Sequence, residues 1–524
     1  MKRIILLPIV ALCMPAFAQK SATANYAQHI TGQRLKEHLT IIASDEMQGR
    51  ETGTEGQRKA AAYIQKQFQA IGLKTPPGQT GYQQYYPLFQ DSLRKSELKI
   101  GKAEPVYGTD YIVSLPANET GKFKSDNLVF AGYGIEDSAY SDYTGLDVKG
   151  KVVIILAGEP KKDGLYLVSG AKNSSAWTFP GTAKKIGVAA AKGAVGAIVI
   201  SPMQETFSQR MIDNSMKTAV QFPRESKDAK LNYVMMSPSF AKTISPEMAE
   251  WIDMAKNYAA FTPEQHKLIN QEVKYEFTKM RMDLQSSNVI GVLEGTDLKD
   301  EYVFVTGHYD HLGMRNGKIY YGADDDGSGT VSVITMAEAF AKAKKAGKGP
   351  RRTMVFMTVS GEEKGLWGSE YYSDHPLFPL DKTSVDLNID MVGRVDTERK
   401  KDDTLNYVYV VGHDKLSSEL PGINEAANKA SSNITLDYLF DDPNDKNRIY
   451  FRSDHYNFAR KGVPVLFFYD GMLKADYHQP TDTVDKINFP LYEKRVRMIF
   501  TTAWEMANRN KMLVRDIPLP AMSR

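Results

Sequence analysis

The chain has 524 residues, of which 42% are hydrophobic and 25% charged, and its formal net charge is +3. This apolar fraction is large enough to build packed cores in two or more domains, and it excludes a disordered chain. The basic residues are scattered along the chain rather than clustered, which argues against a nucleic-acid partner.

The first 18 residues have the pattern of a secretory signal peptide. A basic start at Lys2 and Arg3 precedes an apolar run over residues 4–14, and small residues lead to a cleavage position after Ala18. The run is too short to span a bilayer, which takes about 20 residues. We therefore expect an exported protein, periplasmic or secreted, with no membrane span. The only cysteine is removed with this segment, so we expect no disulfide.

Two kinds of pattern follow in the first half of the chain. Residues 56–73 carry apolar side chains at helical spacing and end at a glycine, which predicts an amphipathic helix. A tyrosine-rich, strand-like stretch continues to about Ile100. From Asp126 to about Val273, short β-rich runs are separated by glycines, with a predicted helix over residues 183–192. This change of texture predicts a separate small domain.

From Ser287 onward, predicted strands alternate with helices. The apolar strand-like runs are separated by helical patterns, of which the clearest cover residues 328–345 and 490–508. Such alternation predicts an α/β fold with a doubly wound, mainly parallel sheet. In sheets of this kind, ligands bind beyond the carboxyl ends of the strands.

Candidate metal ligands follow several of these predicted strands. They are His308 and Asp310, the run Asp324, Asp325 and Asp326, the pair Glu362 and Glu363, then Asp390, and finally His478. Neutral imidazole and ionised carboxylate suit zinc, and one carboxylate can bridge two ions. Two histidines and three acidic residues are therefore enough for a pair of metal ions.

Each of these features has a structural explanation when it is taken alone. A histidine at a strand end is more often structural than a ligand, and an acidic run at the start of a helix is favoured by the helix dipole. Two adjacent carboxylates after an apolar strand, as at Glu362 and Glu363, are costly to bury without a cation. The set as a whole therefore indicates a metal site.

Five motifs in this order carry a resemblance to a known family. They are GHYDHLG, GADDDGSG, SGEEKGLWGS, NIDMVGR and YHQPTDT. The set resembles the co-catalytic dinuclear zinc aminopeptidases of the bacterial leucyl aminopeptidase type, which are related to glutamate carboxypeptidase and the transferrin receptor. The resemblance implies a zinc exopeptidase fold with an inserted, small, β-rich protease-associated (PA) domain. The implied division is a peptidase domain over residues 19–104 and 281–524, with the PA-like domain over residues 105–280.

The resemblance also implies roles for individual residues. One zinc ion would be held by His308, Asp325 and Asp390, and the other by Glu363, His478 and the same Asp325. The family pattern places the bridging ligand at the second of the three consecutive aspartates. Glu362 would be the general base, Asp310 would accept a hydrogen bond from the imidazole of His308, and Tyr477 would donate to the oxyanion.

Several other polar residues are expected to be structural. Ser453, Asp454 and His455 are the residue types of a serine triad, but three neighbours in one loop do not converge in space as a triad requires. We expect His311, His413 and the pair Asp441 and Asp442 to be surface or loop groups, with this acidic loop as a candidate rim of the substrate cleft.

The sequence therefore predicts an exported aminopeptidase that acts on peptide substrates with two Zn²⁺ ions. Three alternatives remain open. A related carboxypeptidase would need a basic pocket for the terminal carboxylate, and a non-catalytic binding relative would be expected to have lost metal ligands. A glutaminyl cyclase uses a similar fold with one zinc, and the PA-like insertion argues against it.

Overall fold

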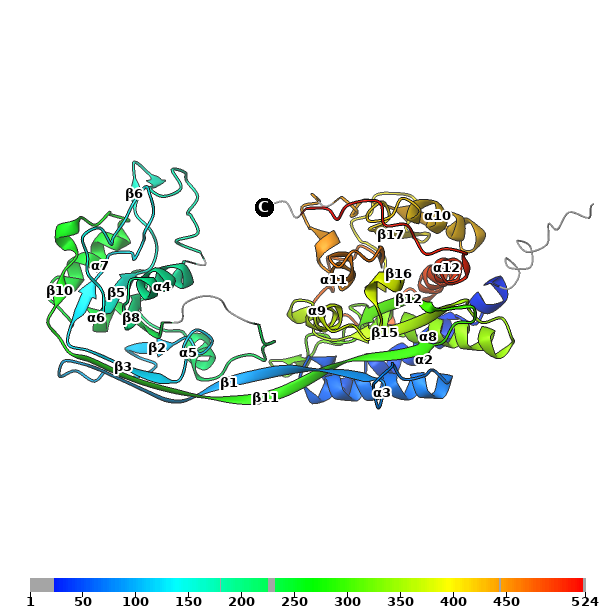
Figure 1. Ribbon diagram of the computed structural model, residues 1–524, viewed down its shortest axis with the longest axis horizontal. Coiled ribbons are helices and arrows are strands. Elements are labelled where there is room, and N and C mark those ends of the chain that lie inside the picture. The colour runs from blue at the N-terminus through cyan, green and yellow to red at the C-terminus, as the bar shows by residue number, and fades with distance from the viewer. Residues whose placement is uncertain (1–22, 180, 225–230, 443, 522–524) are drawn as a thin grey trace, which may run out of the picture. The chain divides into compact units, whose positions relative to one another are not determined.

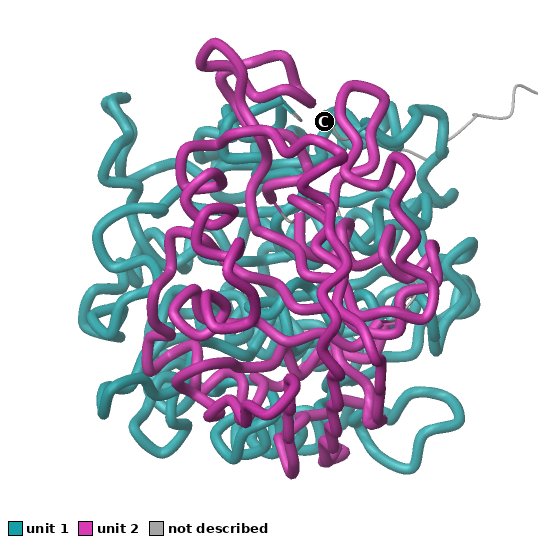
Figure 2. The backbone as a smooth tube through the Cα atoms, turned by 90° about the vertical axis from the view of Figure 1, so that its left-hand side faces the viewer, with its two compact units in different colours: residues 1–86, 285–524 teal, residues 87–284 magenta. Residues whose placement is uncertain are grey.

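The computed structural model describes residues 23–179, 181–224, 231–442 and 444–521. The expected signal peptide lies outside this part of the chain. Two compact units are present: unit 1 comprises residues 1–86 and 285–524, and unit 2 comprises residues 87–284 (Figure 2). The chain passes from unit 1 to unit 2 within strand β1 (Gln83–Ile100) and returns to unit 1 within strand β11 (Val273–Leu293). Within the described ranges, no helix combines the length and the apolar character needed to cross a membrane.

The core of unit 1 is a mainly parallel sheet (Figure 1). The strand order is β11, β15, β12, β16, β19, β17 and β18, and the central strands β15, β12, β16 and β19 are parallel to one another. Their bounds are β11 (Val273–Leu293), β15 (Arg352–Val359), β12 (Leu298–His308), β16 (Thr383–Ile389), β19 (Val465–Tyr469), β17 (Tyr407–Val411) and β18 (Thr435–Asp437). β11 and β17 are antiparallel to the neighbours β15 and β19. The predicted α/β fold with a mainly parallel sheet is confirmed.

Helices cover both faces of this sheet because side chains alternate along each strand. Val303 and Val305 of β12 belong to the core under one set of helices, whereas Phe304 belongs to the core on the opposite face. The first set is α2 (Gly32–Ile42), α3 (Glu55–Ile71), α8 (Gly327–Lys345), α10 (Leu420–Ala430) and α12 (Phe489–Asn508), and the second is α9 (Trp367–Asp374) and α11 (His455–Ala459). The sheet is therefore doubly wound.

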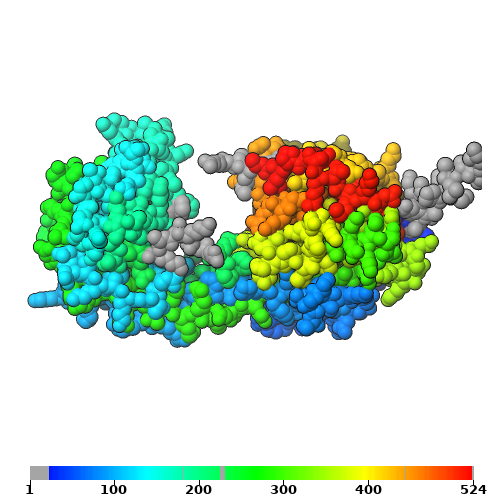
Figure 3. Space-filling model, in the orientation of Figure 1, coloured from blue at the N-terminus to red at the C-terminus, as the bar shows by residue number. Residues whose placement is uncertain are grey.

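Unit 1 has local features at the end of α3, in the segment after α12 and before α8. Helix α3 ends at Gly72, whose positive φ of 87° closes the last turn, as the sequence predicted. At the other end, the segment after α12, coloured red, lies on the surface of unit 1 (Figure 3). There, Arg515 Nη2 donates to the carbonyl oxygens of Leu380 and Thr383, both at 2.7 Å. A short hairpin of β13 (Met314–Arg315) and β14 (Lys318–Ile319) precedes α8.

Unit 2 has its own six-stranded sheet and its own core. The strand order is β10 (Leu268–Ile269), β4 (Leu128–Phe130), β5 (Val152–Leu156), β8 (Gly196–Ile200), β9 (Tyr233–Met236) and β2 (Tyr111–Val113). The four central strands are parallel, and the two edge strands are antiparallel. The helices are α4 (Thr182–Ala191), α5 (Gln209–Met216), α6 (Pro238–Ala241) and α7 (Met248–Lys256), and the remaining strands are β1 (Gln83–Ile100), β3 (Gly121–Ser125), β6 (Lys161–Lys162) and β7 (Leu165–Tyr166). Unit 2 thus mixes helices and strands more evenly than its β-rich sequence pattern indicated.

Candidate metal centre

The proposed ligands come from the carboxyl ends of the parallel strands in unit 1. β12 ends at His308, β15 is followed by a turn that carries Glu362 and Glu363, and β16 is followed by Asp390. His478 lies in the loop after β19. Because these strands are parallel, their carboxyl ends meet at one edge of the sheet. The fold therefore brings together residues that lie up to 170 positions apart in the sequence.

His308 lies at the centre of a first group of ligand atoms. Its Nε2 is 3.4 Å from Asp325 Oδ1 and 3.6 Å from Asp390 Oδ1. Asp390 is held from its other side, since Ser453 Oγ donates to Asp390 Oδ2 at 2.6 Å. The three proposed ligands of one metal position therefore converge.

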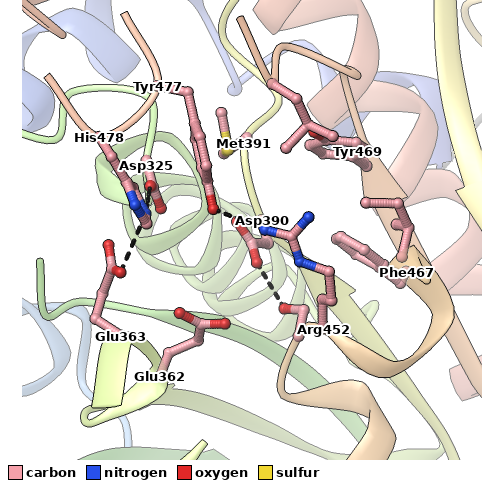
Figure 4. A pocket seen from close by; sticks show the side chains of 13 residues that line it. Asp325, Glu362, Glu363, Asp390, Met391, Arg452, Phe467, Tyr469, Tyr477 and His478 are labelled. Carbon is pink, nitrogen blue, oxygen red and sulfur yellow. Dashed lines mark hydrogen bonds and ion pairs between the residues drawn. The ribbon is translucent and has the colours of Figure 1, made fainter. Parts of the chain in front are cut away.

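His478 lies in a second group on the other side of Asp325. Its Nε2 is 3.1 Å from Asp325 Oδ2 and 3.1 Å from Glu363 Oε2 (Figure 4). Asp325 thus turns one carboxylate oxygen toward His308 and the other toward His478. This is the arrangement that a carboxylate bridging two cations requires.

The contacts of the three consecutive aspartates distinguish Asp325 from its neighbours. Asp324 Oδ1 accepts a hydrogen bond from Gly393 N at 2.8 Å. Both carboxylate oxygens of Asp326 accept main-chain N–H groups: Oδ1 from Gly329 at 2.7 Å and Oδ2 from His308 at 3.0 Å. These two carboxylates hold the surrounding loops in place, whereas that of Asp325 faces the two histidines.

The residues present fit a pair of cations. Three buried ligand atoms have no hydrogen-bond partner among the described residues: His308 Nε2, Asp325 Oδ2 and Glu363 Oε1. Buried polar atoms without partners are costly, and buried carboxylates are costlier still unless a cation compensates their charge. The separations of 3.1–3.6 Å between neighbouring ligand atoms are close to the value of about 3.3 Å expected for two atoms that share one tetrahedral zinc ion.

Glu362 lies beside this cluster without joining its contacts. Its Oε2 is 3.9 Å from His308 Nε2, and its side chain is 14% exposed. Burial raises its pKa well above the ordinary value; the nearby carboxylates Glu363 and Asp390 raise it further, and His308 acts in the opposite direction. Glu362 is thus a carboxylate beside the metal positions with a raised affinity for a proton.

Asp310 supports the site by contacts that differ from the expected one. The backbone carbonyl of Asp310 lies 3.1 Å from His308 Nδ1, whereas its carboxylate Oδ1 is 3.7 Å from that nitrogen. The carboxylate accepts hydrogen bonds from Thr52 Oγ1 at 2.6 Å and from Glu362 N at 3.2 Å. Asp310 therefore fixes the His308 ring through its main chain and the Glu362 loop through its side chain.

Tyr477 lines a cavity of about 200 Å³ that is also lined by Asp325, Glu363 and His478. Its ring stacks on that of His478, with centroids 3.9 Å apart, and its hydroxyl accepts a hydrogen bond from Arg452 Nη2 at 3.0 Å (Figure 4). The Tyr477 hydroxyl is therefore free to donate its own proton elsewhere. Part of the cavity wall is apolar or aromatic, formed by Met391, Ile449, Phe467, Tyr469 and Leu473, and the rest is formed by the charged and polar side chains of the site.

Ser453, Asp454 and His455 do not bond to one another, as expected of neighbours in one loop. Ser453 holds Asp390, Asp454 Oδ1 accepts from Ser369 Oγ at 2.5 Å, and His455 Nε2 contacts the carbonyl oxygen of Tyr450 at 2.9 Å. Burial lowers the pKa of His455 to about 3, so its ring is neutral. These contacts are structural.

Two of the groups expected at the surface or in loops lie in loops but are buried. His311 is fully buried and lies against Glu363. Asp441 is also buried. Its carboxylate accepts a hydrogen bond from the main-chain nitrogen of Gly412 and contacts His413 Nδ1 at 2.5 Å. His413 is partly buried against Tyr438, whereas Asp442 is exposed. Hydrophobic patterning cannot predict such burial, because the groups are polar and lie in loops.

Two further residues that hold the site were not singled out from the sequence. Arg50 is fully buried and donates to the carbonyl oxygens of Tyr309 at 2.7 Å and Gly322 at 2.8 Å. These two residues flank the segment 310–321. The carboxylate of Asp482 accepts from the main-chain nitrogens of Asp324 and Asp325, each at 3.1 Å. Asp482 lies inside the motif YHQPTDT, but neither the spacing nor the periodicity marks either residue.

Comparisons with known proteins show which family and which relatives the sequence resembles. Residues 288–503 match the sequence model of peptidase family M28. The chain is 28% identical to aminopeptidase YwaD of Bacillus subtilis (strain 168) over 233 residues, which cover 43% of this chain and 46% of that protein. It is 26% identical to a probable zinc metalloprotease of Pyrenophora teres f. teres (strain 0-1) over 270 residues, which cover 43% of this chain and 52% of that protein. The match thus spans about half the length of these curated relatives.

A solved structure has the same fold over most of the chain. An aminopeptidase from Aneurinibacillus sp. strain AM-1 aligns with a TM-score of 0.51 at 18% sequence identity, covering 95% of this chain and 99% of that one. At this level of identity, the likeness shows the fold alone.

Proposed function

We propose that the protein is an exported aminopeptidase that uses two zinc ions, because residues 288–503, which contain all of the candidate ligands, match the sequence model of peptidase family M28. His308, Asp325 and Asp390 hold one ion, while Asp325, Glu363 and His478 hold the other. The observation that carries the proposal is the position of Asp325, whose two oxygens face the two histidines at 3.4 and 3.1 Å. The names of the aminopeptidase and zinc metalloprotease relatives support the same activity and metal.

Bound zinc would lower the pKa of a water at the site and polarise the scissile carbonyl of the substrate. Glu362 takes the proton from that water and delivers it to the leaving amine, because it lies beside both ligand groups and contributes to neither. Asp310 holds the main chain of Glu362 in place. Tyr477 donates to the oxyanion that develops on the carbonyl oxygen, since Arg452 bonds to its oxygen and leaves its proton free.

The cavity beside the ligands supports cleavage near a chain end. It holds about 200 Å³ and its walls include Met391, Phe467 and Tyr469. A space of this size can hold the side chain of one residue. The apolar walls suit an apolar first residue.

The assay that tests this function combines metal analysis with matched substrates. Purified full-length protein is expected to carry close to two zinc ions and to hydrolyse leucine anilide but not its N-acetylated form. Removal of zinc with a chelator should abolish the activity, and added zinc should restore it. Cleavage of an N-blocked dipeptide would indicate the carboxypeptidase alternative. Activity that persists in metal-free protein would rule out the zinc mechanism.

We also propose that residues 105–280 form a PA-like inserted domain. None of the proposed ligands lies in this range, so a variant that lacks it should keep its zinc if the remainder folds, while its substrate selection changes.

The expected export is tested separately. The mature protein recovered from its host should begin at Gln19, directly after the signal peptide.

A further inference from the structure

His311 is a buried histidine that the proposed zinc positions leave without a role. Its side chain is 0% exposed, and neither Nδ1 nor Nε2 has a hydrogen-bond partner among the described residues. A buried imidazole with both nitrogens unpaired is costly in an apolar environment. Its surroundings, however, are ligand atoms rather than apolar side chains.

The imidazole of His311 faces the same two carboxylates as His478. His311 Nδ1 lies 2.8 Å from Glu363 Oε1 and 3.8 Å from Asp325 Oδ2. His478 Nε2 lies 3.1 Å from each of these two carboxylates, and the two imidazole rings are 5.9 Å apart at an interplanar angle of 68°. His311, Asp325 and Glu363 form one group whose ligand atoms all lie within 4.8 Å of one another, and His478 Nε2 contacts the same two carboxylates.

The chain holds His311 firmly in this place. Its main-chain nitrogen donates to the carbonyl oxygen of Arg50 at 3.3 Å. Gly322 packs directly against the ring: a Cβ on this residue would lie 2.5 Å from His311 Cγ, and its φ of +54° also favours glycine. The ring thus has little room to turn away from the carboxylates.

A simple hydrogen bond to Glu363 does not account for this contact. The distance between His311 Nδ1 and Glu363 Oε1 is short enough, but the direction is not that of a hydrogen bond, and both atoms remain without a partner. Ligand atoms that point at a common ion, rather than at each other, have this kind of geometry. The separation of His311 Nδ1 from Glu363 Oε1, 2.8 Å, is about 0.5 Å below the value of about 3.3 Å expected for two ligands of one zinc ion, and its separation from Asp325 Oδ2, 3.8 Å, is about 0.5 Å above that value.

We propose that His311 Nδ1 is a further ligand of the zinc ion held by Glu363 and His478, an inference that rests on the proposed two-zinc function. The two metal positions then differ. One has four protein ligands, His311, Asp325, Glu363 and His478, and the other has three, His308, Asp325 and Asp390. Sites with four protein ligands are typical of structural zinc, whereas three leave a position for water or substrate. The His308 position is then the one open to substrate.

The direct test is a crystal structure of the zinc-loaded full-length protein, with the ions located by anomalous scattering. We expect His311 Nδ1 within about 2.2 Å of the ion near His478. A separation above about 3 Å, with a water or another group between them, would overturn the inference. If the protein binds no zinc at all, the proposed function fails instead, so the two failures can be told apart.

The second test measures zinc affinity in variants, by competition with a chromophoric chelator. His311→Ala should lower the affinity for one of the two zinc ions by at least 10-fold and leave the affinity for the other unchanged. His311→Asn provides the same test if the alanine variant does not fold. The control is His38→Ala, which removes a histidine that is equally buried but bonds to Tyr63 at 2.7 Å, away from the ligands. Equal affinities in the His311 variants and the wild type would contradict the assignment.

Discussion

Glu362 and Glu363 are neighbours in the sequence, but their carboxylates contact different groups. Glu363 lies 2.8 Å from His311 Nδ1 and 3.1 Å from His478 Nε2, whereas the nearest histidine nitrogen to Glu362 is His308 Nε2 at 3.9 Å. The contacts of Glu363 and Glu362 thus differ in the way expected if Glu363 is the proposed metal ligand and Glu362 the proposed general base.

The first prediction concerns this pair. Glu362→Gln keeps the shape of the side chain and removes the base, so kcat should fall by about 10²–10⁴-fold while both zinc ions remain. Glu363→Gln should instead lose one zinc ion, and added zinc should restore part of the activity. Zinc stoichiometry measured beside kcat distinguishes the two roles. The assignment is wrong if Glu362→Gln loses metal while Glu363→Gln keeps both its metal and its turnover.

A second prediction concerns Ser453, which donates to Asp390 Oδ2 at 2.6 Å and accepts from Asn388 Nδ2 at 2.8 Å. Ser453→Ala removes the group that orients Asp390, so zinc affinity at the His308 position should fall by about 10–100-fold. Release of zinc to a competing chelator measures the change. Ser418→Ala, at an exposed position of unit 1, is the control. Unchanged zinc release in Ser453→Ala would show that Asp390 is held well enough without this hydrogen bond.

A third prediction concerns the Tyr477 hydroxyl. Tyr477→Phe should lower kcat by about 10²–10³-fold, the effect typical of losing one donor to an oxyanion, with zinc content unchanged. Tyr456→Phe provides a control, since Tyr456 packs against the aromatic side chains of Tyr450 and Phe451. If Tyr477→Phe retains wild-type kcat, the tyrosine only packs beside His478.

A fourth prediction follows from a buried lysine in unit 2. Lys185 Nζ donates to the carbonyl oxygens of Leu156 at 3.2 Å and Gly158, and burial lowers the pKa of Lys185 from 10.5 to about 7. Between these two pH values, the unfolded chain binds a proton that the folded chain lacks. The free energy of unfolding should therefore rise with pH in this window, by up to about 1.4 kcal/mol per pH unit.

Urea unfolding at pH 7 and pH 9 tests this expectation. Lys185→Met, which is similar in size and carries no charge, should remove this part of the rise. The matched control is Lys184→Met, one position earlier on the same helix and exposed, which should keep the wild-type pH dependence. The same rise in Lys185→Met as in the wild type would mean that Lys185 stays protonated in the folded protein.

The sequence predicted the elements that have strong periodicity. The helices expected over residues 56–73 and 328–345 are observed at Glu55–Ile71 and Gly327–Lys345. Helix α11, His455–Ala459, has only five residues and so offers no period to detect. Helix α10 was also missed, although Pro421 in its first turn is a signal that could have marked its start.

The site shows where prediction from the sequence stops. Residues at strand ends, such as His308 and Asp390, could be expected to meet because parallel strands bring their carboxyl ends together. His311 lies three residues beyond β12, in a loop whose path depends on Arg50 and Gly322. Neither the spacing nor the polarity of the sequence indicates that this loop turns back toward Glu363.

Arg50 gives this chain a cross-link of an unusual kind. Its guanidinium joins the carbonyl oxygen of Tyr309, 259 positions away, to that of Ile42 and to those of Tyr321 and Gly322. Closing so long a loop costs conformational entropy, which the folded chain must offset. Unlike a disulfide, which also restricts the unfolded chain, Arg50 joins the N-terminal segment to residues 309–322 only in the folded protein, and it does so independently of redox conditions.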